Sequence, residues 1–83
     1  MSNESVNLKR LIESLSLDFE NLKSREIDNN SNLNSLLDWS SLNALILTAR
    51  VKQDFKVELL PGELRATETF GQLLNLINAK RSG

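Results

Sequence analysis

The 83-residue chain contains no cysteine and no histidine. Without cysteine it has no disulfide, no thiolate nucleophile and no sulfur ligand for a metal, and without histidine it lacks the commonest general base. The three glycines, Gly62, Gly71 and Gly83, are too far apart to form a phosphate-binding loop. We therefore expect a protein that is not an enzyme, holds no metal and has no catalytic residues.

An excess of charge of one sign and long apolar runs are also missing. Ten Lys and Arg residues oppose eleven Asp and Glu residues, and this formal net charge of −1 does not predict a nucleic-acid surface. No apolar run approaches the roughly 20 residues that cross a bilayer, and the polar residues 1–10 do not resemble a secretory signal. We expect a cytoplasmic monomer that binds neither nucleic acid nor a membrane.

The composition that remains is that of one small globular domain. Forty per cent of the residues are hydrophobic and 25% are charged, which is ordinary for a folded protein. We expect a single domain over residues 1–83, with an ordered core over about residues 5–78.

Apolar residues recur at helical spacing in the first half of the chain. A helix is predicted over about Ser5–Lys23, capped by Ser2, Asn3 or Ser5. Its buried face comprises Leu8, Leu11, Ile12, Leu15, Phe19 and Leu22, and Leu17 falls off that face. A second helix is predicted to begin between Asp38 and Ser41 and to end between Asp54 and Lys56. Its apolar positions are Leu42, Leu45, Ile46 and Ala49, then Val51 or Phe55, with Leu47 widening the stripe.

A third long helix is predicted to begin near Thr69, where Thr69 and Gln72 fit a capping box. Its buried positions are Phe70, Leu73, Leu74 and Ile77, and it is expected to fray from Asn78. Ser24–Asp38 is predicted to be a long ordered loop, and a short helical turn is predicted over Glu63–Ala66, after the Pro61-Gly62 turn signal. The predicted fold is all-α: a bundle of three main helices plus one short helix, with a long loop between the first two.

One motif carries a functional signal. Asp38-Trp39-Ser40-Ser41-Leu42 lies where the long loop meets the second predicted helix. Here the sequence resembles the acyl carrier protein family, in which the serine of a D-S-L motif opens the second of four helices. The matching serine is Ser41, and Leu42 is the motif leucine. The resemblance runs without a gap from Glu26 to Ile77 and includes the segments Glu26–Leu33, Asp54–Leu59, Thr67–Phe70 and Leu73–Ile77.

This resemblance implies that Ser41 carries 4′-phosphopantetheine, attached from coenzyme A by a phosphopantetheinyl transferase. The thiol of that arm would hold acyl intermediates as thioesters and present them to fatty-acid or polyketide-type biosynthetic enzymes. Because the cofactor supplies the thiol, the lack of catalytic side chains is expected. We also expect four leucine and valine side chains in the core, and the resemblance implies that they shelter an acyl chain between the second helix and the short one: Leu33, Val51, Leu59 and Leu64.

The chain departs from the family pattern in charge. Ser40 stands where aspartate is usual and Asn43 where an acidic residue is frequent, and the span 38–55 has balanced charge. A neutral helix does not steer a basic partner towards itself. We therefore expect Leu42 and Ile46 to dock, by apolar contact, to acyl-transfer and condensing enzymes of a dedicated pathway.

Two other functions remain open from the sequence. The cargo of the same arm is aminoacyl or peptidyl in the carriers of nonribosomal synthesis. Alternatively, the chain is an unmodified helical protein-interaction module in which Ser41 only caps a helix. Trp39 is interpreted as a partly buried anchor of the loop–helix corner, with a partner contact as the alternative.

Overall fold

The computed structural model of the chain describes residues 6–24, 26–37 and 40–82, apart from the side chains of Ser24, Leu37, Ser41 and Ser82. The elements in chain order are α1 (Leu8–Ser16), the 3₁₀ helix η1 (Glu20–Ser24), α2 (Leu33–Leu37), α3 (Ser41–Phe55), α4 (Pro61–Arg65) and α5 (Phe70–Ser82). The described residues contain no strand, only an isolated bridge between Asn32 and Thr69. The all-α prediction, with α1, α3 and α5 as main helices, is therefore confirmed.

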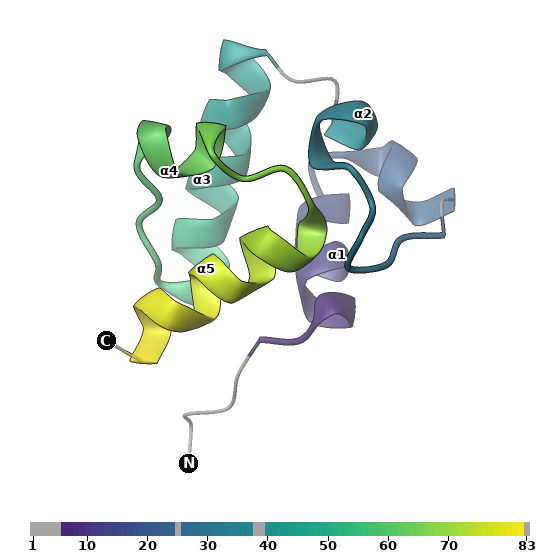
Figure 1. Cartoon of the computed structure of the whole chain (residues 1–83). Coiled ribbons are helices and arrows are strands. Elements are labelled where there is room, and N and C mark those ends of the chain that lie inside the picture. The colour runs from purple at the N-terminus through teal and green to yellow at the C-terminus, as the bar shows by residue number, and fades with distance from the viewer. Residues whose placement is uncertain (1–5, 25, 38–39, 83) are drawn as a thin grey trace.

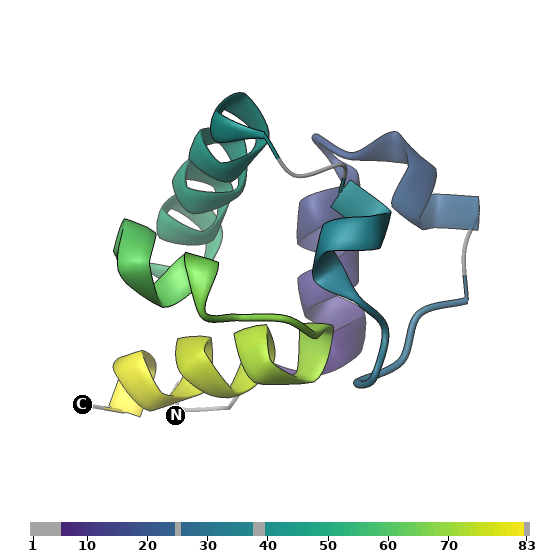
Figure 2. The ribbon, with the colours of Figure 1, turned by 45° about the horizontal axis from the view of Figure 1, so that its top comes forward.

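The three main helices enclose one core. In Figures 1 and 2, α1 and α3 lie beside each other and α5 crosses them near the beginning of α1 and the end of α3. The fully buried side chains of these helices are Leu11, Leu15, Leu47, Val51, Phe70, Leu73 and Ile77. Leu33, Leu59 and Leu64 from the connecting segments are also buried, as the sequence predicts, and so is Val51. No helix in the described ranges has the length and apolar character required to cross a membrane.

The first predicted helix is too long. It ends at Ser16, and the chain then turns before η1. Ser16 Oγ donates to Ile12 O at 2.6 Å, and Leu17 N donates to Ser14 O at 3.2 Å, the shorter step of a 3₁₀ turn. The cap is Asn7, whose Oδ1 accepts a hydrogen bond from Arg10 N at 2.8 Å. The break leaves the buried face intact, since Phe19 and Leu22 are buried on the far side of the turn.

The long loop contains a helix that was not predicted, α2. Asn32 caps it, because its Oδ1 accepts from Ser35 N at 3.0 Å. The same loop is bound to the start of α5 by backbone hydrogen bonds: Leu33 N donates to Glu68 O at 2.8 Å, Phe70 N donates to Ser31 O at 3.1 Å and Gly71 N donates to Asn29 O at 2.9 Å. These bonds fix the segment that leads towards α3.

The boundaries of α3 are predicted correctly, but its buried face is not. The sequence pattern placed Leu42 and Leu45 in the apolar stripe of this helix, and they are 66% and 68% exposed. Leu47, Val51 and Phe55 form the buried face instead. Apolar residues surround much of the first half of this helix, so periodicity alone does not select the side that meets α1. Ala49 is also exposed, and Ile46 is half-buried.

The helix α5 begins at Phe70, after its predicted cap, whereas α4 begins at Pro61, two residues before the predicted start at Glu63. Pro61 is the first residue of α4, so the Pro-Gly pair opens a helix and does not precede it as a turn. At α5, Gln72 N donates to Thr69 Oγ1 at 3.1 Å, and Glu68 N donates to Gln72 Oε1 at 2.7 Å, which confirms the capping interaction.

The predicted fraying from Asn78 is wrong, since α5 continues to Ser82. The amide of Asn78 accepts from Val6 N at 2.8 Å and donates to Val6 O at 2.9 Å. Lys80 Nζ lies 2.9 Å from Glu63 Oε1, and Arg81 donates to Phe55 O at 3.2 Å. These contacts to three other segments hold the last turns of α5 in place.

Candidate functional site

Ser41 is the first residue of α3, as the sequence predicts. Ser40 precedes it as the N-cap: its Oγ accepts from Asn43 N at 3.1 Å, and its carbonyl accepts from Ala44 N at 2.9 Å. The side chain of Ser41 and all of Asp38 and Trp39 lie outside the described residues, and so does the prediction that Trp39 anchors the corner.

An apolar groove of about 750 Å³ begins at this turn. Its α3 side consists of Ser40, Ala44, Leu45 and Thr48, four residues on one face of the helix. The opposite side consists of Leu59, Pro61, Leu64 and Arg65, from α4 and the segment before it. A groove of this size lies within the usual range of small-molecule sites.

The residues predicted to shelter an acyl chain are only partly those of the groove. Leu59 and Leu64 line it, as expected. Leu33 and Val51 have no exposed surface and belong to the core between the main helices. Leu45 also lines the groove, and the sequence pattern placed it in the apolar stripe of α3.

Arg65 is the charged residue of the groove, and sequence reasoning missed it. It ends α4 directly after Leu64, and it makes no hydrogen bond or ion pair with any residue within the described ranges. The sequence gives no signal for it, since adjacent residues on a helix, here Leu64 and Arg65, do not share a face. That Arg65 lines a groove follows only from the position of α3 on the opposite side.

The most exposed of the described side chains in the first half of α3 are apolar. Leu42 and Leu45 are exposed, and Leu60, before α4, is 54% exposed. Ile46 packs partly against the core. Of the two residues predicted to contact partners, Leu42 therefore exposes a large apolar surface, whereas Ile46 exposes a smaller one.

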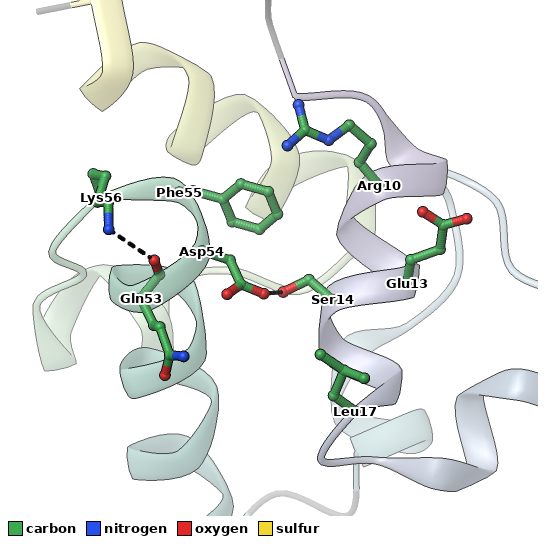
Figure 3. A pocket seen from close by; sticks show the side chains of 8 residues that line it. All are labelled: Arg10, Glu13, Ser14, Leu17, Gln53, Asp54, Phe55 and Lys56. Carbon is green, nitrogen blue, oxygen red and sulfur yellow. Dashed lines mark hydrogen bonds between the residues drawn. The ribbon is translucent and has the colours of Figure 1, made fainter.

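A second pocket, of about 430 Å³, lies between α1 and the end of α3 and is shown in Figure 3. Ser14 Oγ donates to Asp54 Oδ2 at 2.5 Å across it. Arg50 Nε lies 2.8 Å from Asp18 Oδ2, and Arg50 NH1 lies 3.6 Å from Asp54 Oδ1. The hydrogen bond to Asp18 is the main cause of a raised pKa of Arg50.

Two cations on the remaining wall of that pocket also have partners within the protein. The guanidinium of Arg10 lies over the Phe55 ring, 5.9 Å from its centroid, and Lys56 Nζ donates to Gln53 O at 3.2 Å. The hydrogen bond between Ser14 and Asp54 and the contact between Arg10 and Phe55 join α1 to the end of α3. We therefore interpret the contacts in this pocket as structural, because they hold α1 against the end of α3.

Over the residues whose placement is described, no group of three or more Asp, Glu, His or Cys side chains is arranged to hold a metal ion. No family model matches the sequence, and no match was found among the curated proteins or the solved structures. The start of α3 and the groove beside it are therefore the candidate functional site.

Proposed function

We propose that this chain is an acyl carrier protein, and that a phosphopantetheinyl transferase attaches 4′-phosphopantetheine from coenzyme A to Ser41. The observation that supports the proposal is the apolar groove that begins at the N-cap of α3, next to Ser41. A serine at a helix start is common as a cap, but here Ser40 performs the capping. The following serine is thus not needed for that role.

The start of α3 fits the phosphodiester of such an arm. The first backbone N–H groups of a helix have no partner within the helix, and the helix dipole favours negative charge there. The first turn of α3 contains no acidic residue that would repel a phosphate. α3 has 15 residues and is packed through Leu47 and Val51, so its N-terminal turn is built on a rigid element. The bound group supplies the thiol that this chain lacks.

The groove fits the apolar part of a cargo. Leu45, Leu59 and Leu64 offer aliphatic surface that starts beside the proposed attachment residue. Each buried methylene contributes about 0.8 kcal/mol, so even a short chain gains from lying in it. A cargo sheltered in this way is kept from water while it is carried.

Partner enzymes would meet the outer face of α3. Leu42 and Leu45 are exposed on it, and Arg50 is paired with Asp18. We propose that acyl-transfer and condensing enzymes dock on this face by apolar contact through Leu42, with Leu45 as a second contact and Ile46 contributing its exposed edge. Leu45 is thus added to the two contact residues expected from the sequence, Leu42 and Ile46.

The test is the intact mass of the protein after incubation with coenzyme A and a broad-specificity phosphopantetheinyl transferase. We expect a gain of one phosphopantetheine group, which is lost in Ser41→Ala. Ser40→Ala is the matched control, since it removes the neighbouring hydroxyl at a cost of about 1 kcal/mol of stability. It should still be modified. An unmodified but folded wild-type chain, or modification that survives Ser41→Ala, contradicts the proposal.

The alternative functions give different results in the same system. An unmodified interaction module is favoured by the exposed Leu42, Leu45 and Leu60, and it would show no mass gain. For a modified chain, loading by an adenylating enzyme in place of a malonyl transferase indicates an aminoacyl or peptidyl carrier.

A further inference from the structure

The groove beside α3 has two hydroxyl groups that are already engaged. Ser40 Oγ accepts from Asn43 N at 3.1 Å, and Thr48 Oγ1 donates to Ala44 O at 2.8 Å. Both bonds are within α3 and its cap. Neither hydroxyl carries a charge, so neither binds an ionised group as strongly as a cation does.

Arg65 differs from them because no described residue neutralises it. The carboxylate of the same helix, Glu63, is committed elsewhere: its Oε1 accepts from Leu60 N at 2.9 Å and lies 2.9 Å from Lys80 Nζ. The groove thus combines an aliphatic wall with one cation, Arg65, that pairs with none of the described residues. A guanidinium binds a carboxylate through paired, charge-assisted hydrogen bonds.

We propose that the cargo of this carrier is an aliphatic chain that ends in a carboxylate. Its methylene groups lie against Leu45, Leu59 and Leu64, and its terminal carboxylate lies beside Arg65. The inference rests on the proposed function, because it names the class of cargo held by the arm on Ser41.

Charge complementarity selects this occupant over a purely hydrocarbon chain. A plain alkyl end placed beside Arg65 would displace water from the guanidinium and give it no partner in return. A terminal carboxylate replaces that water with an ion pair. Because Arg65 is exposed, the pair contributes at the level of a surface ion pair, equivalent to about a threefold to fivefold effect.

The test uses the chain modified at Ser41 and loaded with a 7-carboxyheptanoyl group whose terminal carboxyl is labelled with ¹³C. NMR measures the pKa of that carboxyl on the protein and in the free coenzyme A thioester. We expect attachment to the protein to lower the proton affinity of the terminal carboxyl about threefold to fivefold. Arg65→Gln should remove the effect, whereas Lys52→Gln, which removes the same charge from the exposed side of α3, should retain it.

A second pair of variants tests the aliphatic wall. Leu45→Asn should weaken the effect on the carboxyl, because it replaces a groove residue that is 68% exposed. Leu17→Asn is the matched control, since Leu17 is 63% exposed but lies outside the groove. An unchanged carboxyl pKa on the loaded protein, or equal loss of the effect in Lys52→Gln, overturns the inference.

The groove is also tested without the arm. On unmodified Ser41→Ala protein, octanoate should bind about threefold to fivefold more tightly than octanamide, and this preference should vanish in Arg65→Gln. The inference is overturned if octanoate and octanamide bind equally, or if the protein dimerises through the groove and binds neither. This binding experiment needs no phosphopantetheine on the protein. A failure of the proposed carrier function and a failure of the proposed cargo class therefore give separate results.

Discussion

Two glycines occupy matched positions, one residue after the start of α4 and of α5, and we expect alanine to act in opposite directions there. A Cβ on Gly71 would lie 2.9 Å from Asn29 O, a backbone atom. A Cβ on Gly62 would meet nothing within 4 Å. Both are second residues of a helix, so the change in intrinsic propensity is the same and the surroundings decide the difference.

The magnitude follows from what each position allows. Gly62→Ala should stabilise the protein by about 0.4–1 kcal/mol, because alanine restricts the unfolded chain and fits the native backbone. At Gly71 the loop cannot move away freely, since Gly71 N is itself bonded to Asn29 O, and the loop is further held by the bonds from Phe70 N to Ser31 O and from Leu33 N to Glu68 O. Overpacking costs about 1–3 kcal/mol, which exceeds the helix-propensity gain of up to about 1 kcal/mol.

The assay is thermal unfolding followed by circular dichroism, with urea unfolding at 25 °C as a second measurement. For a domain of this size, each kcal/mol corresponds to about 4–8 °C in Tm. Gly62→Ala should melt above the wild type and Gly71→Ala below it. If both variants shift in the same direction, the close approach of Asn29 to Gly71 does not limit stability and the reasoning is refuted.

Two further predictions concern the last helix and the α4–α5 contact. Phe70→Ala should destabilise by about 3–5 kcal/mol, because the ring is completely buried, and Leu74→Ala by clearly less, because Leu74 is half-buried; equal urea midpoints for the two would contradict the packing described. The pKa of Glu63 lies below its ordinary value, first because Leu60 N donates to it and next because of Lys80. The stability it contributes is therefore present above the ordinary carboxyl pKa and is lost as pH falls through the lowered folded value. Glu63→Gln should melt below the wild type at pH 7, and the gap in Tm should narrow towards pH 3.

Local signals in the sequence predicted the parts of the fold that depend on neighbouring residues. Thr69 and Gln72 are three residues apart, and their capping interaction forms as expected. The end of α3 near Phe55 is also local, since Lys56 takes a left-handed conformation with φ 61° and closes the helix.

Two of the errors involve partners distant in the chain. The turn after α1 places Asp18 against Arg50, 32 residues away, and no periodicity within α1 contains that information. The buried face of α3 is chosen by contact with the rest of the core, so Leu45 was misplaced.

For the candidate site, the sequence predicted that Ser41 begins a helix and that Leu59 and Leu64 lie near an apolar space. Arg65 could not be predicted as part of it. Its relevance depends on how α4 sits against α3, which is a tertiary property.

The side-chain amide of Asn78 binds both backbone groups of Val6, across 72 residues of sequence. During synthesis on the ribosome, Val6 cannot make these bonds until Asn78 has emerged, so the helices from α1 to α4 can all form before Val6 is held. A nascent chain stalled before Asn78 would present Val6 without these bonds to proteases and chaperones, whatever helices had already formed.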